Sequence, residues 1–146
     1  MLRTNAAAFG HRMMMDRVVP GGVSCDLAAA HAAVMRDECT RFAREIALLR
    51  DIYDEHTGLQ DRIRLCGIVT PELAAKLGLP GLAGRASGGA RDLRRDFPVP
   101  PYDVLDVRVA TQKTGDVAAR VAVRFDEAQE SLRLIRVIVD SMIATP

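Results

Sequence analysis

Apolar residues recur at helical spacing in two long stretches of this chain. In the first stretch they follow one another in steps of four and three: Met35, Cys39, Phe42, Ile46, Leu49 and Tyr53. This spacing places them in one stripe along a helix. We predict that the helix runs from about Ser24, its capping residue, to His56 and stops at Gly58. Such a helix far exceeds the usual length of roughly 11–12 residues, so it is expected to pack along another long helix.

The second stripe lies near the C-terminus and predicts a helix over residues 116–143, started by Gly115-Asp116. Its apolar positions also step by four and three: Val117, Val121, Phe125, Ala128, Leu132, Ile135, Val139 and Met142. We expect the two long helices to pack along each other. Burial of six residues tests this prediction: Phe42, Ile46, Leu49, Phe125, Leu132 and Ile135.

Shorter elements surround these helices. Residues from Thr4 to Val18 predict a first helix, and residues from Leu59 to Cys66 predict a short one. Thr70-Pro71-Glu72 combines a cap, a proline in the first helical position and an acid in the first turn, which predicts a helix ending at Gly78. Periodicity is lost from Leu79 to Pro101, where glycine and proline are frequent.

Apolar and polar residues alternate from Leu105 to Val109, the period of a β-strand. No other segment offers itself as a partner strand, and a lone strand leaves its edges unpaired. We therefore expect this strand to find its partner outside the chain. The pattern as a whole predicts a mainly α fold of long packed helices, with a Gly/Pro-rich loop and one short β segment.

Composition narrows the class of protein. The 146 residues include 20 basic and 19 acidic ones, a formal charge of +1 that gives no reason to expect a nucleic-acid partner. No apolar run approaches the roughly 18–20 residues needed to span a bilayer, and the N-terminus has no apolar signal core. Cys25, Cys39 and Cys66 form no CxxC pair, so we interpret them as buried, reduced thiols and expect no metal or cluster here.

Two segments carry candidate chemistry. The first contains Gly84, Arg85, Ser87, Gly88 and Gly89, followed by Arg91, Asp92, Arg94 and Arg95. Glycine allows close backbone approach and arginine supplies forked donors, so this Gly/Arg loop could hold an anion or a polarised cofactor group. The alternative is a surface loop with solvated arginines or structural Arg–Asp pairs.

The second segment is Pro20-Gly21-Gly22-Val23, which on local grounds is a tight turn. His11, His31 and His56 lie far apart, and a satisfied structural role is expected for each. No Ser–His–Asp or Cys–His set can be assembled from the sequence.

The order of these pieces resembles a known family. The chain presents Gly10-His11-Arg12, Pro20-Gly21-Gly22-Val23, the stretch 62–68, the loop 81–94, Pro101-Tyr102-Asp103 and a final-helix group of Gly115-Asp116, Arg120, Arg124, Glu127 and Ser131. In this order they resemble the large subunit that nickel–iron hydrogenases share with NADH-quinone oxidoreductases, where it is the D-type subunit. The wording Phe9-Gly10-His11-Arg12-Met13 leans toward the membrane-bound, formate-hydrogenlyase-like branch.

The resemblance has departures. Leu82 stands where the family's Gly-Pro-x-x-Arg-Ala-Ser-Gly block has proline, and neither cysteine pair that ligates nickel and iron in the hydrogenases is present. The resemblance thus implies that residues 1–146 are one partial domain, the central to C-terminal part of the large-subunit fold without its metal-ligand ends. A nickel–iron centre would be possible only in the full-length protein.

The resemblance implies an oxidoreductase subunit that passes electrons to protons or to a quinone in the complete protein, with no catalytic residue in this stretch. Arg12, Arg85, Ser87, Asp92 and Arg94 are expected to line a cavity. Arg85 is expected to point inward, oriented by Asp92 or a neighbouring carbonyl, toward a concavity shared with the Pro20–Val23 turn.

Expected partners are an iron–sulfur small subunit and membrane subunits, with the chain peripheral on the cytoplasmic side of the inner membrane. The alternative is a non-catalytic helical scaffold or interaction module.

Overall fold

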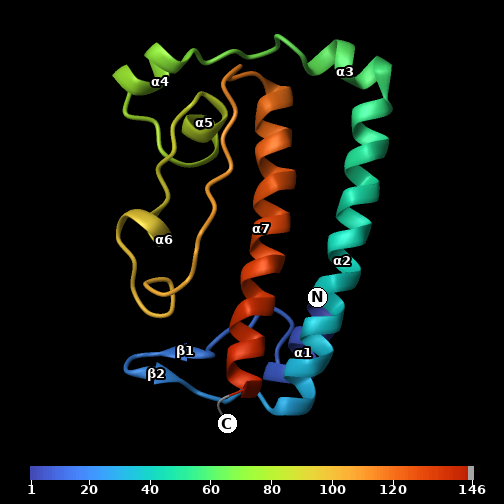
Figure 1. Ribbon diagram of the computed structural model, residues 1–146, viewed down its shortest axis with the longest axis vertical. Coiled ribbons are helices and arrows are strands. Elements are labelled where there is room, and N and C mark those ends of the chain that lie inside the picture. Colours follow the sequence, from blue (N-terminus) through green and yellow to red (C-terminus); the bar gives the residue numbers. More distant parts are fainter. Residues whose placement is uncertain (145–146) are drawn as a thin grey trace. The chain divides into compact units, whose positions relative to one another are not determined.

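The computed structural model describes residues 1–144 and is mainly helical, as the sequence predicts (Figure 1). Its elements, in chain order, are α1 (Leu2–Phe9), β1 (Val18–Val19), β2 (Gly22–Val23), α2 (Ala29–Glu55), α3 (Thr57–Ile63), α4 (Pro71–Lys76), α5 (Gly81–Ala86), α6 (Leu93–Asp96) and α7 (Val117–Ala144). The chain divides into two compact units. The first comprises Met1–Phe42 and the chain from Ile135 to its C-terminus, and the second comprises Ala43–Leu134.

Helix α1 of the first unit is shorter than predicted. It ends at Phe9 because Gly10 adopts a left-handed conformation, with φ of 72°, and its amide bonds the carbonyl of Ala6. Glycine reaches this conformation without steric cost and ends many helices in this way. The prediction that the helix continues to Val18 was therefore wrong.

A small hairpin follows in the first unit. Strands β1 and β2 pair antiparallel, Val18 with Val23 and Val19 with Gly22. Pro20 and Gly21 form the two-residue turn between them, so the predicted turn is confirmed, but inside a hairpin. The Ser24 amide and hydroxyl donate to the carbonyls of residues 17 and 16 at 2.9 Å. Ser24 thus closes this loop instead of capping α2, which begins only at Ala29.

In the second unit, α2 and α7 contact each other as predicted. The rings of Tyr53 and Phe125 lie 5.5 Å apart, Arg50 pairs with Asp126, and the Gln129 amide donates to the Ala43 carbonyl at 2.8 Å. Five of the six test residues are buried or half-buried: Phe42, Ile46, Phe125, Leu132 and Ile135.

Leu49 is the exception, with 56% of its surface exposed. The side of α2 that meets α7 carries Ala43, Arg50 and Tyr53, and Leu49 lies one helical step away from Arg50. The apolar stripe predicted that Leu49 contacts α7, but at this level of α2 the contact is the ion pair between Arg50 and Asp126.

The segment 105–109 is not a strand, so this prediction was wrong. Side chains of α7 bond one amide and one carbonyl of this segment. The Arg108 amide donates to the Glu130 carboxylate at 2.9 Å, and the guanidinium of Arg133 donates to the Asp106 carbonyl. Val107 is buried, which explains the alternating pattern. Whether another chain bonds the remaining groups of this segment stays a prediction.

The stretch expected to be irregular contains two short helices, α5 and α6. Helix α5 lies against α7 around a core of Ala86, Ala119 and Val123, with Leu82 and Ala110 packed against it (Figure 1). Alanine in these positions lets the two helices approach closely, because no larger side chain separates their backbones.

The cysteines differ in environment. Cys39 is fully buried, Cys25 is half-buried and Cys66 is exposed, so the expectation of three buried thiols holds for Cys39 alone. Burial raises the pKa of the Cys39 thiol, so this group stays protonated at neutral pH. Among residues 1–144, no helix is long and apolar enough to cross a membrane.

Candidate functional site

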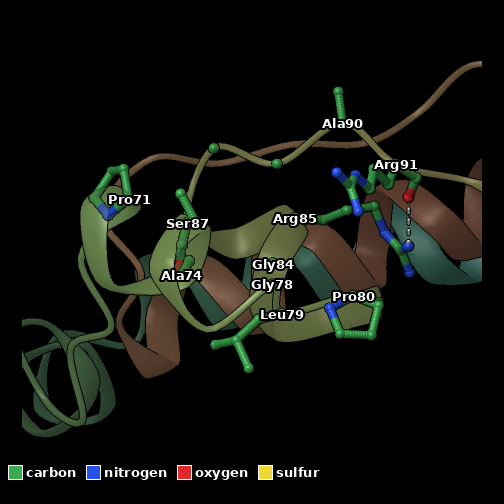
Figure 2. A pocket seen from close by; sticks show the side chains of 14 residues that line it. Pro71, Ala74, Gly78, Leu79, Pro80, Gly84, Arg85, Ser87, Ala90 and Arg91 are labelled. Carbon is green, nitrogen blue, oxygen red and sulfur yellow. Dashed lines mark hydrogen bonds between the residues drawn. The ribbon is translucent and has the colours of Figure 1, made fainter.

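The Gly/Arg loop borders a pocket of about 350 Å³ in the second unit (Figure 2). Helix α4, the turn after it, helix α5 and the loop beyond α5 form its walls. Its lining residues are mostly small: Pro71, Ala74, Ala75, Gly78, Leu79, Pro80, Gly81, Gly84, Arg85, Ser87, Gly88, Gly89, Ala90 and Arg91. The pocket therefore combines apolar walls with two guanidinium groups, which lie together at one end (Figure 2).

Local sequence signals build this pocket. The Thr70 hydroxyl caps α4 by accepting from the Leu73 amide at 3.2 Å, and Pro71 occupies the first turn, as predicted. The helix ends at Lys76, close to the predicted end at Gly78. A Cβ atom on Gly84 would lie 2.1 Å from the Leu79 carbonyl oxygen, so only glycine permits α5 to approach this turn.

Arg85 reaches from α5 to α7. Its guanidinium donates to Glu127 through Nε at 2.7 Å and also pairs with it through Nη2, while Nη1 donates to the Arg91 carbonyl at 3.2 Å. The Arg85 side chain is only 16% exposed, so it is not a solvated surface arginine. We call this contact the Arg85–Glu127 clasp. It joins the Gly/Arg loop to the final helix.

The predicted partner of Arg85 was partly right. A neighbouring carbonyl, that of Arg91, does orient it, but Asp92 does not. Asp92 instead caps α6 through the Arg94 amide and pairs with the Arg94 guanidinium at 2.7 Å. The hydrogen bond to Arg94 holds the pKa of Asp92 below its usual range. These two predicted site residues therefore form one ion pair beside the pocket.

Ser87 has a structural role beneath the pocket. It is 2% exposed, and its hydroxyl donates to the Val69 carbonyl at 2.8 Å. Gly115 lies beside it, donating its amide to the Ala86 carbonyl at 2.9 Å. A Cβ atom on Gly115 would lie 1.9 Å from the Val69 carbonyl oxygen. Ser87 thus anchors the loop to the segment before α4, and the Gly115 amide anchors it to the start of α7.

Arg12 is exposed and lies in the first unit, whereas the other four predicted residues lie in the second. Its carbonyl accepts from the Asn5 side chain at 3.2 Å. The Pro20–Val23 turn also belongs to the first unit. The proposed role of Arg12 and the concavity shared with that turn remain predictions.

Two carboxylates make contacts in the second unit that sequence reasoning did not predict. Asp116 accepts from the amides of Leu65 and Ala119 and from the Thr114 hydroxyl. Burial alone would raise the pKa of Asp116, but these hydrogen bonds outweigh it and hold the pKa below the ordinary range. Glu127 was noted only as part of the final-helix pattern. No local signal pairs it with Arg85, 42 residues earlier.

The residues present do not fit a nickel–iron centre. Such a site needs converging thiolates, and the three cysteines differ in environment: Cys39 is buried, Cys25 is half-buried and Cys66 is exposed. Within residues 1–144, no group of three or more His, Cys, Asp or Glu side chains is arranged to hold a metal ion. The arrangement offers instead a mostly apolar pocket with Arg85 and Arg91 at one end, and the Arg85–Glu127 clasp ties its wall to α7.

Comparisons with known proteins agree on one family. The sequence profile described as "Respiratory-chain NADH dehydrogenase, 49 Kd subunit" matches residues 1–146. An NADH-quinone oxidoreductase subunit of Rhizobium etli is 36% identical over 137 residues, covering 94% of this chain and 34% of the relative. A chloroplastic NAD(P)H-quinone oxidoreductase subunit of Agrostis stolonifera is 34% identical over 140 residues, covering 96% and 36%.

A solved structure shares the fold. It is that of the membrane-bound sulfane sulfur reductase, an archaeal respiratory membrane complex. The match has a TM-score of 0.87 and 26% sequence identity, and it covers 96% of this chain and 38% of that one. The chain spans about a third of the length of the curated relatives it matches.

Proposed function

Because this chain belongs to the family of the 49 kDa subunit of respiratory-chain NADH dehydrogenase, we propose that it forms part of the large subunit of a membrane-associated oxidoreductase complex. In the complete protein, electrons would pass to a quinone or to protons. The observation that carries the proposal is the family match over residues 1–146. The relatives are themselves subunits of NADH-quinone oxidoreductases.

The geometry supports a positioning role for this stretch. The clasp between Arg85 and Glu127 joins two blocks that the family resemblance placed far apart in sequence, the Gly/Arg loop and the final helix. Such a contact fixes the loop with charge-assisted hydrogen bonds, which are shorter and stronger than neutral ones. Arg85, Ser87, Asp92 and Arg94 would thereby shape a cavity wall, and the redox chemistry would lie in other parts of the assembly.

The sequence of the first block of the resemblance supports an assignment to one branch of the family. The run Phe9-Gly10-His11-Arg12-Met13 favours the hydrogenase-related, formate-hydrogenlyase-like branch. An iron–sulfur small subunit and membrane subunits would then be the partners, and they would hold the chain at the cytoplasmic side of the inner membrane.

A tagged copy of the full gene product, purified from detergent-solubilised membranes, tests the proposal. We expect it to co-purify with an iron–sulfur protein, seen by electron paramagnetic resonance. We also expect the preparation to reduce quinone, or to evolve hydrogen, with NADH, formate or reduced ferredoxin as donor. A product recovered free of other subunits and without donor-dependent turnover would contradict the proposal.

Exposed apolar side chains on α2 favour a second candidate function, a non-catalytic scaffold. Leu48, Leu49 and Ile52 are each more than half exposed, which suits docking to other chains. The same purification separates the candidates, because a scaffold would enter a complex that shows no donor-dependent turnover.

A further inference from the structure

Three segments of the second unit meet at the base of the Gly/Arg loop: the loop itself, the bend 65–69 and the stretch 112–120 that leads into α7. Backbone hydrogen bonds join the stretch to the loop. The Gln112 amide donates to the Arg85 carbonyl at 2.8 Å, and the Gly115 amide donates to the carbonyl of the next loop residue at 2.9 Å. The position of the Gly/Arg loop therefore depends on the stretch 112–120.

Gly115 is the residue at which all three segments are in contact. Its amide bonds the Gly/Arg loop, and its carbonyl accepts from the Val69 amide of the bend at 3.0 Å. A Cβ atom on Gly115 would lie 2.9 Å from the Ser87 hydroxyl and closer still to the Val69 carbonyl, so the backbones approach each other without room for a side chain. Because the contact is this close, a shift of Gly115 would carry the loop with it.

Arg120 holds Gly115 from α7. Its Nη2 atom donates to the Gly67 carbonyl at 2.6 Å and to the Gly115 carbonyl at 3.1 Å. Hydrogen bonds from a charged donor are roughly twice as strong as neutral ones. Both acceptors are backbone groups, so this guanidinium fixes the course of the chain at the bend and at the start of α7.

Arg120 lies outside the lining of the pocket, whereas Arg85 is part of that lining. From these contacts we propose that Arg120 is a positioning residue for the Gly/Arg loop. Arg120 holds the Gly115 carbonyl, the Gly115 amide holds the loop, and the loop carries Arg85. The inference rests on the proposed function, in which the loop shapes a cavity wall in an oxidoreductase subunit.

The two arginines differ in how they use their nitrogens, and this difference selects the variants. Arg85 uses all three nitrogens, on two different partners. Arg120 serves both of its carbonyls from Nη2 alone. Lysine ends in one charged nitrogen with three donors, so Arg120→Lys should keep both hydrogen bonds. Methionine keeps an unbranched stem without a charged donor, so Arg120→Met removes the hydrogen bonds but retains much of the packing.

Hydrogen exchange of the full gene product, followed by mass spectrometry, measures the attachment of the loop without requiring turnover. In Arg120→Met we expect about tenfold faster exchange at the amides of Gln112 and Gly115, because their acceptors lie on the Gly/Arg loop. Arg120→Lys should restore slow exchange at both amides. Arg136→Met, at an exposed arginine of the same helix, should leave them unchanged.

Three results of this experiment would overturn the inference. The first is unchanged exchange in Arg120→Met. The second is faster exchange confined to the bend 65–69, because Arg120 would then hold the bend without positioning the loop. The third is faster exchange throughout the chain, because the substitution would then lower stability in general.

Turnover of the assembled complex gives a second readout. Arg120→Met should lower donor-dependent turnover about fivefold at a normal amount of complex, since a misplacement of about 1 Å can cost up to roughly 100-fold. Arg120→Lys should restore the turnover. Unchanged turnover in Arg120→Met, or equal loss in both variants, overturns the positioning role. An unsubstituted gene product without partners or turnover overturns the proposed function instead, while the exchange experiment still decides whether Arg120 positions the loop.

Discussion

At the scale of single residues, Asp116 does more than start a helix. The sequence predicted that Gly115-Asp116 begins the last helix, and this is confirmed. The Asp116 carboxylate also accepts from the Leu65 amide at 3.0 Å, which helps to hold Leu65 in a left-handed conformation with φ of 59°. That contact joins residues 51 positions apart, and no periodic pattern in a sequence reports such a pair.

Replacing Asp116 by Asn should destabilise the chain by about 2 kcal/mol, because a cap and a buried charge-assisted bond are both weakened. The native pKa of Asp116 lies below its unfolded value. Its contribution is therefore complete above the unfolded pKa and is lost as pH falls through the native one. Urea unfolding at several pH values measures this. We expect Asp116→Asn to flatten the acidic limb of the stability profile, with exposed Asp103→Asn as control. An unchanged acidic limb would refute this role.

At the scale of elements, the spacing of apolar residues predicts which side chains are buried, but it does not predict what an element's backbone bonds. The helical stripes predicted α2 and α7 because a period of about 3.6 describes one element packed on another. The alternation from Leu105 to Val109 was equally regular, yet the segment is not a strand. Alternation indicates which side chains are buried, but it does not indicate which groups bond the backbone. Here the side chains of Glu130 and Arg133 bond one amide and one carbonyl of the segment.

One substitution can weaken the hydrogen bonds that hold residues 105–109 to α7, which we call the tether. Glu130 accepts from the Arg108 amide and from Arg133 at 2.7 Å. Burial alone would raise its pKa, but these bonds outweigh that effect and lower it. Glu130→Gln should release residues 105–109, and tryptic cleavage after Arg108 should become roughly tenfold faster, as loss of about 1.5 kcal/mol implies. The matched control is Asp140→Asn, at an exposed residue that pairs with Arg36. Equal cleavage of both variants would argue against the tether.

At the scale of the whole molecule, apolar exposure predicts association. Large apolar side chains stand free on several elements, including Val18 at 84%, Leu65 at 79% and Val104 at 81% exposed. Surfaces of this kind mark binding faces or aggregation liabilities. We expect the isolated chain to self-associate in sedimentation velocity runs as concentration rises. A monodisperse monomer with a cooperative melt would show a self-sufficient domain instead.

The purified chain should also bind no nickel, iron–sulfur cluster or flavin, because soft metals need converging thiolates. Elemental analysis and an absorption spectrum are the measurements. Stoichiometric metal or a flavin band would overturn the prediction.

The sequence could predict the parts of the site that depend on local signals, but not those that depend on tertiary contacts. Glycine and arginine mark the loop locally, so the loop was found, and a neighbouring carbonyl was one of the two partners predicted for Arg85. Glu127 was not assigned to Arg85, because the choice between Asp92 and a carboxylate on another helix depends on tertiary geometry. In the structure Asp92 forms its ion pair with Arg94, two residues away, and not with Arg85.

The most direct test of the account is Arg85→Lys in the full gene product, with Arg62→Lys as the exposed control. Lysine keeps the charge but loses the fork that bonds Glu127 and the Arg91 carbonyl together. We predict a normal amount of assembled complex with about tenfold lower donor-dependent turnover, since a misplacement of about 1 Å can cost up to roughly 100-fold. Unchanged turnover and stability in Arg85→Lys would contradict the central claim that the Arg85–Glu127 clasp positions a functional loop.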